Sequence, residues 1–392
     1  MGAKLFAGET GWRRGWGRAA ALLGAVTLGL GAIPAQAAAP AATGSYTIFN
    51  NPTGSTPDHR IETDLVSLVD GAPAGSEIHG EMFTWTRTPV ATALKNAQAR
   101  GVRVYLAIDR AGAGDSNLKP DNEAIKILKS AGLTRLVFCG SASAGYSSCI
   151  SSRKGAINHN KVFMFSATKN MTNAVWVSSQ NLTNSQNEHF NNAVVVHGDK
   201  PLYDFFDQHL DAMLNQKRTS NYNKYFRSDT ASVRAYLSPR ADSKGGTSAE
   251  HSTDTIAQVL KYVKSEPGCT VDVAHAQFTG PRQPVISELV RIGKLGCKVR
   301  VLVGDNLSQY VRDAFKGQKN ITVRQLKKLH SKYIVVKSHY NDTAKRHLVF
   351  TGSQNLTGPA LRTHDETLIR VERPDVSKDY ADNFSAIWAK GS

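Results

Sequence analysis

Two short motifs in this chain place a histidine and a lysine two residues apart. His159 and Lys161 form the first H-x-K motif, and His330 and Lys332 form the second. Residues two apart on a β-strand project to the same face, so each motif would present an imidazole beside an ammonium group. An imidazole can attack an electrophile or move a proton, and ammonium groups hold anions. The two motifs together predict one composite site built from two halves.

An apolar run and a Ser-Gln-Asn segment follow each H-x-K motif. The segments SSQNLT and GSQNLT differ at one position in six. Their polar side chains, which could hold the non-bridging oxygens of a phosphate together with the lysines, are Ser179, Asn181, Ser353 and Asn355. This set suits phosphoryl transfer, in which one histidine attacks phosphorus and the other protonates the leaving oxygen. The mechanism needs no metal ion and no cofactor, because the lysines supply the positive charge.

The stretch before each motif is also duplicated. Alternating apolar patterns predict a strand at 75–85, a helix at 89–100 and a strand at 102–108. One offset of 195 residues relates three matching pairs: Phe83 and Phe278, Pro89 and Pro284, and Gly101 and Gly296. We therefore expect an α/β protein with two α-β-α sandwich halves, at 46–225 and 226–392. A pseudo-twofold axis would relate the halves and place the site at their interface.

The two halves differ in length between Gly101 or Gly296 and the following histidine. The first half is longer by 24 residues there, and the extra segment includes 139–153. A long loop beside a site usually shapes access to it. The second half has a smaller insertion at 339–346, between the two strands of its motif. Two further helices, at 204–215 and 380–390, are expected to close the two halves.

The N-terminus has the three regions of a secretory signal peptide. Arg13, Arg14 and Arg18 precede an apolar run at 19–33, and Ala35-Gln36-Ala37 is a cleavage site of the small-x-small type. We expect a signal peptide at 1–37, a linker at 38–45 and a secreted, extracellular protein. A retained membrane anchor and a twin-arginine signal are the alternatives.

Export makes disulfides the expected state of the four cysteines. Cys139 and Cys149 flank a loop rich in Gly, Ser and Ala, and Cys269 and Cys297 begin two predicted strands that flank a helix. We expect the local pairs Cys139–Cys149 and Cys269–Cys297, although four cysteines allow three pairings. A zinc site is the alternative, but the sequence has no C-x-x-C pair.

The chain is strongly basic, with 48 Lys and Arg against 32 Asp and Glu and a net charge of +16. This charge favours an anionic partner, such as nucleic acid or phospholipid head groups. The basic run 324–332 ends in the second H-x-K motif. It is either a solvated face or a funnel that steers anions to the site, and its position favours the funnel.

The paired motifs resemble those of the phospholipase D superfamily, in which H-x-K-x4-D is followed by G-S/G-x-N in each half. The resemblance covers nearly all of the chain after the signal peptide, because the upstream repeats also fit that fold. It implies a phosphodiesterase that works through a phosphohistidine. The family's Asp is replaced by Ser166 and Lys337, and its first Gly by Ser178. Loss of both Asp residues is similar to the tyrosyl-DNA phosphodiesterase branch.

The resemblance also assigns roles to the two histidines. In this superfamily the acidic residue of one half orients the histidine of the other half. By that resemblance Glu366, eleven residues after Asn355, contacts His159, and Asn192 lies near His330. A carboxylate raises the basicity of an imidazole, so His159 is the expected nucleophile and His330 the expected general acid. The remaining histidines that we considered are expected to be packing or surface residues: His59, His79, His251, His275 and His364.

The substrate class stays open between three hypotheses. The first is a secreted phospholipase D-like phosphodiesterase that cleaves a phospholipid head-group ester and contacts membranes peripherally. The second is a secreted nuclease of the same fold. The third is a decayed enzyme that binds anionic polymers or membranes. No obligate protein partner is inferred. Asn181 and Asn355 also stand in N-x-T sequons, but glycans there would block the site, so we interpret both as phosphate contacts.

Overall fold

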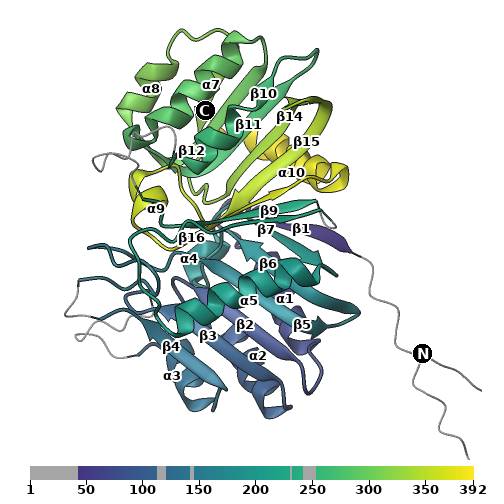
Figure 1. Ribbon diagram of the computed structural model, residues 1–392, viewed down its shortest axis with the longest axis vertical. Coiled ribbons are helices and arrows are strands. Elements are labelled where there is room, and N and C mark those ends of the chain that lie inside the picture. The colour runs from purple at the N-terminus through teal and green to yellow at the C-terminus, as the bar shows by residue number, and fades with distance from the viewer. Residues whose placement is uncertain (1–42, 113–120, 142–144, 230–231, 242–252) are drawn as a thin grey trace, which may run out of the picture. The chain divides into compact units, whose positions relative to one another are not determined.

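A computed structural model describes residues 43–112, 121–141, 145–229, 232–241 and 253–392 (Figure 1). The expected signal peptide at 1–37 and His251 lie outside the described residues. Strand β1 begins at Gly44, so the last two residues of the expected linker belong to a strand. No helix in the described part of the chain is both long enough and apolar enough to span a bilayer.

The first half is built on a seven-stranded sheet with the order β1-β7-β6-β5-β2-β3-β4. Its strands are β1 (Gly44–Asn50), β2 (Glu77–Met82), β3 (Arg103–Asp109), β4 (Arg135–Cys139), β5 (Lys161–Thr168), β6 (Met171–Ser178) and β7 (Asn191–His197). Its helices are α1 (Arg60–Asp70), α2 (Thr88–Ala99), α3 (Glu123–Ser130), the short α4 (Asn184–Asn187) and α5 (Lys200–Leu214). Helices α1 to α3 share a core with one face of the sheet, and α5 shares a core with the other.

The second half contains a nine-stranded sheet with the order β13-β12-β11-β14-β15-β16-β9-β8, and β10 pairs with β14. Its strands are β8 (Tyr225–Ser228), β9 (Val233–Ser238), β10 (Val263–Lys264), β11 (Thr270–Phe278), β12 (Lys298–Leu307), β13 (Ile321–Gln325), β14 (Lys332–Tyr340), β15 (Thr343–Gly352) and β16 (Glu366–Val371). Its helices are α6 (Thr255–Leu260), the 3-10 turn η3 (Gly280–Arg282), α7 (Gln283–Lys294), α8 (Gln309–Phe315), α9 (Gly358–Arg362) and α10 (Pro374–Trp388). The expected α/β fold of two related halves is confirmed.

Apolar spacing explains most of these elements. Helix α1 buries Ile61, Leu65, Leu68 and Val69, which recur at helical intervals on one face. Proline stands in the first turn of α2, α5, α7 and α10, where its missing N–H costs no hydrogen bond. Helix α10 begins at Pro374, six residues before the expected start, because the turn that contains Val376 also packs into the core.

Both sheets use the same strand pairing around their H-x-K motif. In the first half β2 pairs parallel with β3 and antiparallel with β5, which opens with Lys161. In the second half β11 pairs parallel with β12 and antiparallel with β14, which opens with Lys332. Each motif therefore lies beside the carboxyl ends of two parallel strands. The second-half insertion at 339–346 forms the tip of the β14–β15 hairpin.

One hydrophobic cluster belongs to both halves. It contains residues of α5, such as Phe206, and residues of α10, such as Tyr380 and Phe384. It also contains strand residues from both sheets, including Val162 and Tyr333. In Figure 1 the strands β16 and β9 lie at the boundary between the two halves. The shared core fixes the two motif strands relative to each other.

The structure contains both expected disulfides. Cys139 at the end of β4 is bonded to Cys149 in the first-half insertion. Cys269 just before β11 is bonded to Cys297 just before β12. No cysteine remains free.

Candidate active site

The two H-x-K motifs are tied to the opposite half by main-chain hydrogen bonds. His159 N donates to Asp365 O at 2.9 Å, and Asp365 N donates to Ile157 O at 2.9 Å. The second motif repeats the pattern, because His330 N donates to Phe190 O and Phe190 N donates to Lys328 O, both at 2.9 Å. Each histidine is therefore held by the segment that leads into a strand of the other half.

Both lysines of the motifs are buried, with 0% of Lys161 and 1% of Lys332 exposed. Lys161 Nζ donates to His159 O at 2.6 Å, and Lys332 Nζ donates to His330 O at 2.9 Å. Burial lowers the pKa of Lys161 to about 7, against the attraction of Glu366 and Asp109. Burial, and then Lys161, lower the pKa of Lys332 well below its usual value. The site thus contains two buried lysine amines, and each donates to the carbonyl oxygen of the histidine two residues before it.

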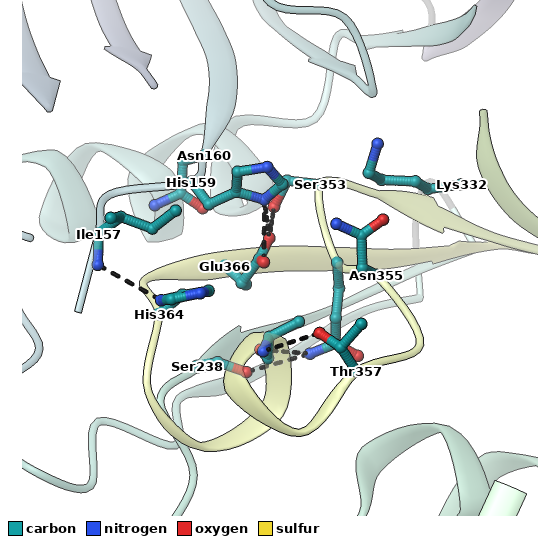
Figure 2. Close-up of polar contacts among 12 residues, drawn as sticks. Ile157, His159, Asn160, Ser238, Lys332, Ser353, Asn355, Thr357, His364 and Glu366 are labelled. Atoms are coloured by element: carbon teal, nitrogen blue, oxygen red, sulfur yellow. Dashed lines mark hydrogen bonds and ion pairs between the residues drawn. The ribbon is translucent and has the colours of Figure 1, made fainter. Parts of the chain in front are cut away.

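His159 is oriented by a carboxylate from the other half. Its Nδ1 lies 2.9 Å and 3.0 Å from the two oxygens of Glu366, as Figure 2 shows. Glu366 is the first residue of β16, and it also accepts a hydrogen bond from Ser353 Oγ. Burial raises the pKa of Glu366 to about 7, although Lys161 and His364 oppose the shift. The contact leaves Nε2 of His159 as the ring nitrogen for reaction.

His330 is oriented by an amide instead. Its Nδ1 donates to Asn191 Oδ1 at 3.0 Å, and its ring lies close to Lys332 Nζ, at 3.2 Å from Nδ1 and 3.4 Å from Nε2. Asn192 was expected from the sequence to lie beside His330. The residue that contacts the ring is instead Asn191, and the side chain of Asn192 accepts a hydrogen bond from Lys332 N. Burial lowers the pKa of both His159 and His330 well below its usual value, and the neighbouring ammonium groups add to the effect.

The serines and asparagines that follow each motif have different contacts. Ser179 Oγ donates to Asn191 Oδ1 at 2.8 Å, and Ser353 Oγ donates to Glu366. These hydroxyls therefore orient the residue beside each histidine and are not turned toward a phosphate. The side-chain oxygens of Asn181 and Asn355 are buried, and neither has a hydrogen-bond partner among the described residues. An amide oxygen accepts hydrogen bonds, as a phosphate oxygen does, so a contact with phosphate would have to come from the NH₂ groups of these two side chains, and it stays a prediction.

A cavity of about 430 Å³ opens beside His159. Besides His159, its polar lining consists of amides and hydroxyls together with a second imidazole: Gln277, Thr279, Asn306, Asn355, Thr357 and His364. Phe83 also lines the cavity, and its ring lies 5.1 Å from the ring of His159 and 5.2 Å from Lys161 Nζ.

Several of these residues were missed by sequence reasoning. His364 was expected to be a packing or surface residue, yet its ring centroid lies 6.5 Å from that of His159. Gln277 and Asn306 lie in the last part of the parallel strands β11 and β12. Both could have been predicted from the sequence, because polar residues at the carboxyl ends of parallel strands often line a binding site.

The two positions at which the family's Asp is replaced lie away from the H-x-K motifs. Ser166 follows Lys161 by five residues on β5, and Lys337 follows Lys332 by five on β14. Five residues of extended strand span about 16 Å. Ser166 Oγ accepts a hydrogen bond from Glu77 N at 2.8 Å, and Lys337 is paired with Thr270 in the sheet. Both replacements therefore belong to the structure of the sheets.

The described residues contain no group of three or more His, Cys, Asp or Glu side chains that could hold a metal ion. The site combines two imidazoles with two lysine amines, two amides and one carboxylate. This set can bind a phosphate and exchange protons with it.

The family model for the PLD-like domain of cardiolipin synthase matches residues 72–214 and 265–388. The chain belongs to the phospholipase D-like family. The two matched segments correspond to the two halves of the fold, so each half is one phospholipase D-like domain. Members of this superfamily are phosphoryl-transfer enzymes.

Solved structures support the same fold. Phosphatidylserine synthase from Haemophilus influenzae aligns with a TM-score of 0.56 at 13% identity, over 83% of each chain. Polyphosphate kinase from Porphyromonas gingivalis aligns with a TM-score of 0.55 at 14% identity, over 87% of this chain. This chain spans about half of that kinase, 50%. Identities this low show the phospholipase D-like fold alone. Comparison with curated protein sequences gave no match.

Proposed function

We propose that this protein is a phosphodiesterase that hydrolyses its substrate through a phosphohistidine on His159. The asymmetry between the two histidines is the observation that supports it. Glu366 contacts His159, whereas the uncharged Asn191 contacts His330. A carboxylate stabilises the positive charge that an imidazole gains when it attacks phosphorus. His159 is accordingly the nucleophile, and His330 is the general acid.

In the first step Nε2 of His159 attacks phosphorus and forms a P–N bond. The bond between phosphorus and the leaving oxygen breaks, and His330 in its protonated form gives its Nε2 proton to that oxygen. The alcohol leaves, and the phosphoryl group stays on His159. The Nδ1 hydrogen bond to Glu366 holds the ring throughout the step.

In the second step water replaces the enzyme at phosphorus. His330, now neutral, takes a proton from the water molecule as its oxygen attacks. The P–N bond breaks, and its electron pair returns to Nε2 of His159. Lys161, Lys332, Asn181 and Asn355 hold the non-bridging oxygens in both steps. A bound phosphate anion raises the pKa of both lysines and of His330, and so opposes the effect of burial on them.

A phospholipid head-group ester is the first candidate substrate. The cavity beside His159 has an amide and hydroxyl lining, which suits a polar head group. A turnover assay on phosphatidylcholine micelles tests this candidate, with release of the head group as the expected result.

A nuclease is the second candidate, and a second hollow favours it. This hollow of about 380 Å³ contains Phe190, whose carbonyl accepts from His330 N, and three lysines: Lys327, Lys328 and Lys390. Lys328 pairs with Glu188, and Asp305 also lines the hollow. A polynucleotide has phosphates on both sides of the cleaved bond, and a lipid does not. Parallel assays on single-stranded DNA distinguish the two candidates.

We also propose that the protein acts outside the cell. The signal-like segment at 1–37 and the two disulfides support export, because disulfides persist in oxidising compartments. N-terminal sequencing of the protein from the culture medium should begin at Ala38.

Substitution of each histidine tests the assigned roles. His159→Ala cannot form the covalent intermediate, so it should be inactive on every phosphodiester. His330→Ala keeps the nucleophile but loses the acid, which is worth about 10²–10⁴-fold on a poor leaving group. It should therefore retain turnover of bis(p-nitrophenyl) phosphate, whose leaving group departs without a proton. The assays should include excess EDTA, in which activity is expected to persist.

Chemical trapping provides the decisive readout. Rapid quenching of His330→Ala during turnover should leave phosphate on His159, which peptide mass spectrometry locates. Phosphate on His330 of the His159→Ala variant would reverse the assignment. If the wild-type protein binds anionic polymers but turns over neither lipid, DNA nor the activated ester, the decayed-enzyme hypothesis is correct.

A further inference from the structure

Asp365 is a buried carboxylate that the proposed reaction does not use. It lies immediately before Glu366, and none of its surface is exposed. Its oxygens accept three main-chain hydrogen bonds from one loop, at 2.8 Å from Cys149 N, 2.9 Å from Ile150 N and 2.7 Å from Ser151 N. The loop therefore forms a cradle of N–H groups around a carboxylate from the other half of the molecule.

The main chain of Asp365 is joined directly to the nucleophile segment. Its carbonyl accepts from His159 N, and its N–H donates to Ile157 O. Its neighbour Glu366 holds the ring of His159. Any movement of Asp365 therefore shifts both the main chain and the side chain that position the imidazole.

The first residue of the cradle, Cys149, is also held by a disulfide. Cys149 supplies one of the three N–H groups, and its sulfur is bonded to Cys139 at the end of β4. Asp109 at the end of β3 adds a second connection, because its Oδ2 accepts from Ser147 Oγ at 2.8 Å and from Asn158 N at 2.7 Å. The loop is thus attached to two strands of the first sheet and to the residue before His159.

The second half provides an internal comparison. Phe190 takes the place of Asp365 there, since it makes the same two main-chain bonds around His330. It has no carboxylate, and the inserted loop belongs to the first half alone. The cradle therefore serves the histidine that the proposed function assigns as the nucleophile.

We propose that Asp365 is a positioning residue for His159, and that the main chain of Cys149–Ser151, attached to β4 by the Cys139–Cys149 disulfide, sets the contact between His159 and Glu366. This inference rests on the proposed function for its effect on turnover, but the geometry it concerns can be measured without turnover.

Burial explains why the cradle matters. Burial raises the pKa of Asp365 to about 7, and the nearby carboxylate of Asp109 adds to the shift. Glu81 adds a further carboxyl group near it, while the guanidinium of Arg218, which donates to Ser151 O, attracts the charged form of Asp365. The three N–H groups are the contacts that favour the charged form. Without them the carboxylate would be buried without compensation, and the segment that contains it would shift.

The first test is Asp365→Asn, which keeps the shape of the side chain but puts an NH₂ group against an N–H donor. A displacement of about 1 Å in a reacting group can cost about 100-fold. We expect kcat on bis(p-nitrophenyl) phosphate to fall by about 10- to 100-fold with little change in KM. The proton on His159 Nδ1, seen by NMR and assigned by its loss in His159→Asn, should shift or broaden.

The second test compares the two disulfides. Cys139→Ala/Cys149→Ala should reproduce both effects of Asp365→Asn, and it serves as the test if Asp365→Asn does not fold. Cys269→Ala/Cys297→Ala is the matched control, because it also removes one disulfide but at the ends of β11 and β12 that lie away from Lys332. In the control both kcat and the His159 signal should match the wild type.

The outcomes separate this inference from the proposed function. If the wild-type protein has no turnover, the proposed function fails, and the NMR signal alone decides the inference. An unchanged His159 signal in both Asp365→Asn and Cys139→Ala/Cys149→Ala would overturn it. Equal losses in the two disulfide variants would also overturn it, because the effect would then be one of general stability.

Discussion

At the scale of single residues, the unusual feature is a pair of buried lysine amines. Lys161 and Lys332 are almost fully buried, and their near hydrogen-bond partners are carbonyl oxygens. Glu366, the carboxylate beside them, is already bonded to His159 and Ser353. The site without a ligand therefore favours the binding of an anion, whose negative charge would complement the two lysines.

This arrangement predicts that anion binding takes up protons. Burial lowers the pKa of Lys161 to about 7, so at pH 8 its amine is mostly neutral in the free protein. A bound sulfate dianion raises that pKa, and the amine then takes a proton from the buffer. Isothermal titration with sulfate at pH 8, in buffers with different ionisation enthalpies, should show uptake, and affinity should fall as pH rises from 7 to 9.

Lys161→Met is the control for this prediction, because it keeps the length of the side chain without the amine. Uptake at pH 8 should decrease in this variant. Binding heats that are the same in every buffer for the wild-type protein would contradict the prediction, since they would mean that no proton is exchanged.

At the scale of elements, each half contains one disulfide, and the two disulfides lie at different distances from the site. Cys139–Cys149 lies in the loop that contacts Asp365, whereas Cys269–Cys297 joins the residues before β11 and β12. The second bridge lies at the opposite end of β11 from the residue that pairs with Lys332. It stabilises the parallel strand pair and has no contact with the site residues.

Removal of the second bridge should therefore lower stability without lowering activity. The bridge spans 28 residues. By chain entropy a loop of that size contributes about 3–4 kcal/mol to the free energy of unfolding. Urea unfolding of Cys269→Ala/Cys297→Ala should show a loss of that size, with kcat unchanged. A free energy of unfolding equal to that of the wild type would show that the bridge contributes nothing.

At the scale of the whole molecule, the two halves are one packed unit. The cluster that contains Phe206 and Tyr380 is made of residues from both sheets. Tyr380 lies 5.0 Å from Phe49 of the first half and 4.9 Å from Tyr333 of the second, measured between ring centroids. Main-chain bonds at both H-x-K motifs cross between the same halves.

The protein should accordingly unfold in a single cooperative transition. A half that lost its partner would expose its side of the shared cluster, so neither half is expected to stay folded alone. Scanning calorimetry should give one peak whose calorimetric and van't Hoff enthalpies agree. Two resolved peaks would show that the halves are independent domains.

The repeated patterns of the sequence determined much of this result. Apolar periodicity located α2, β3, α7 and β12 to within a few residues, because the side-chain periods of helices and strands are local properties. The constant offset between matching residues revealed two copies of one fold. The H-x-K spacing indicated both motifs, but each strand begins at its lysine, so the two histidines precede the strands and do not share a strand face with the lysines. The cysteine positions indicated both disulfides.

The tertiary structure decided the contacts made between distant segments. Counting eleven residues from the Ser-Gln-Asn segments located Glu366 but gave Asn192 in place of Asn191. The reason is that the connection to β7 is one residue shorter than the connection to β16, and only the hydrogen bonds between the strands show this. Ser179 N donates to Asn192 O, and Ser353 N donates to Thr367 O.

The cradle around Asp365 could not be predicted from the sequence either. It joins a loop to a carboxylate more than 200 residues away, at a separation of 216 from Cys149. Such a pair has no local pattern in the chain, since its geometry arises only when the two halves pack together.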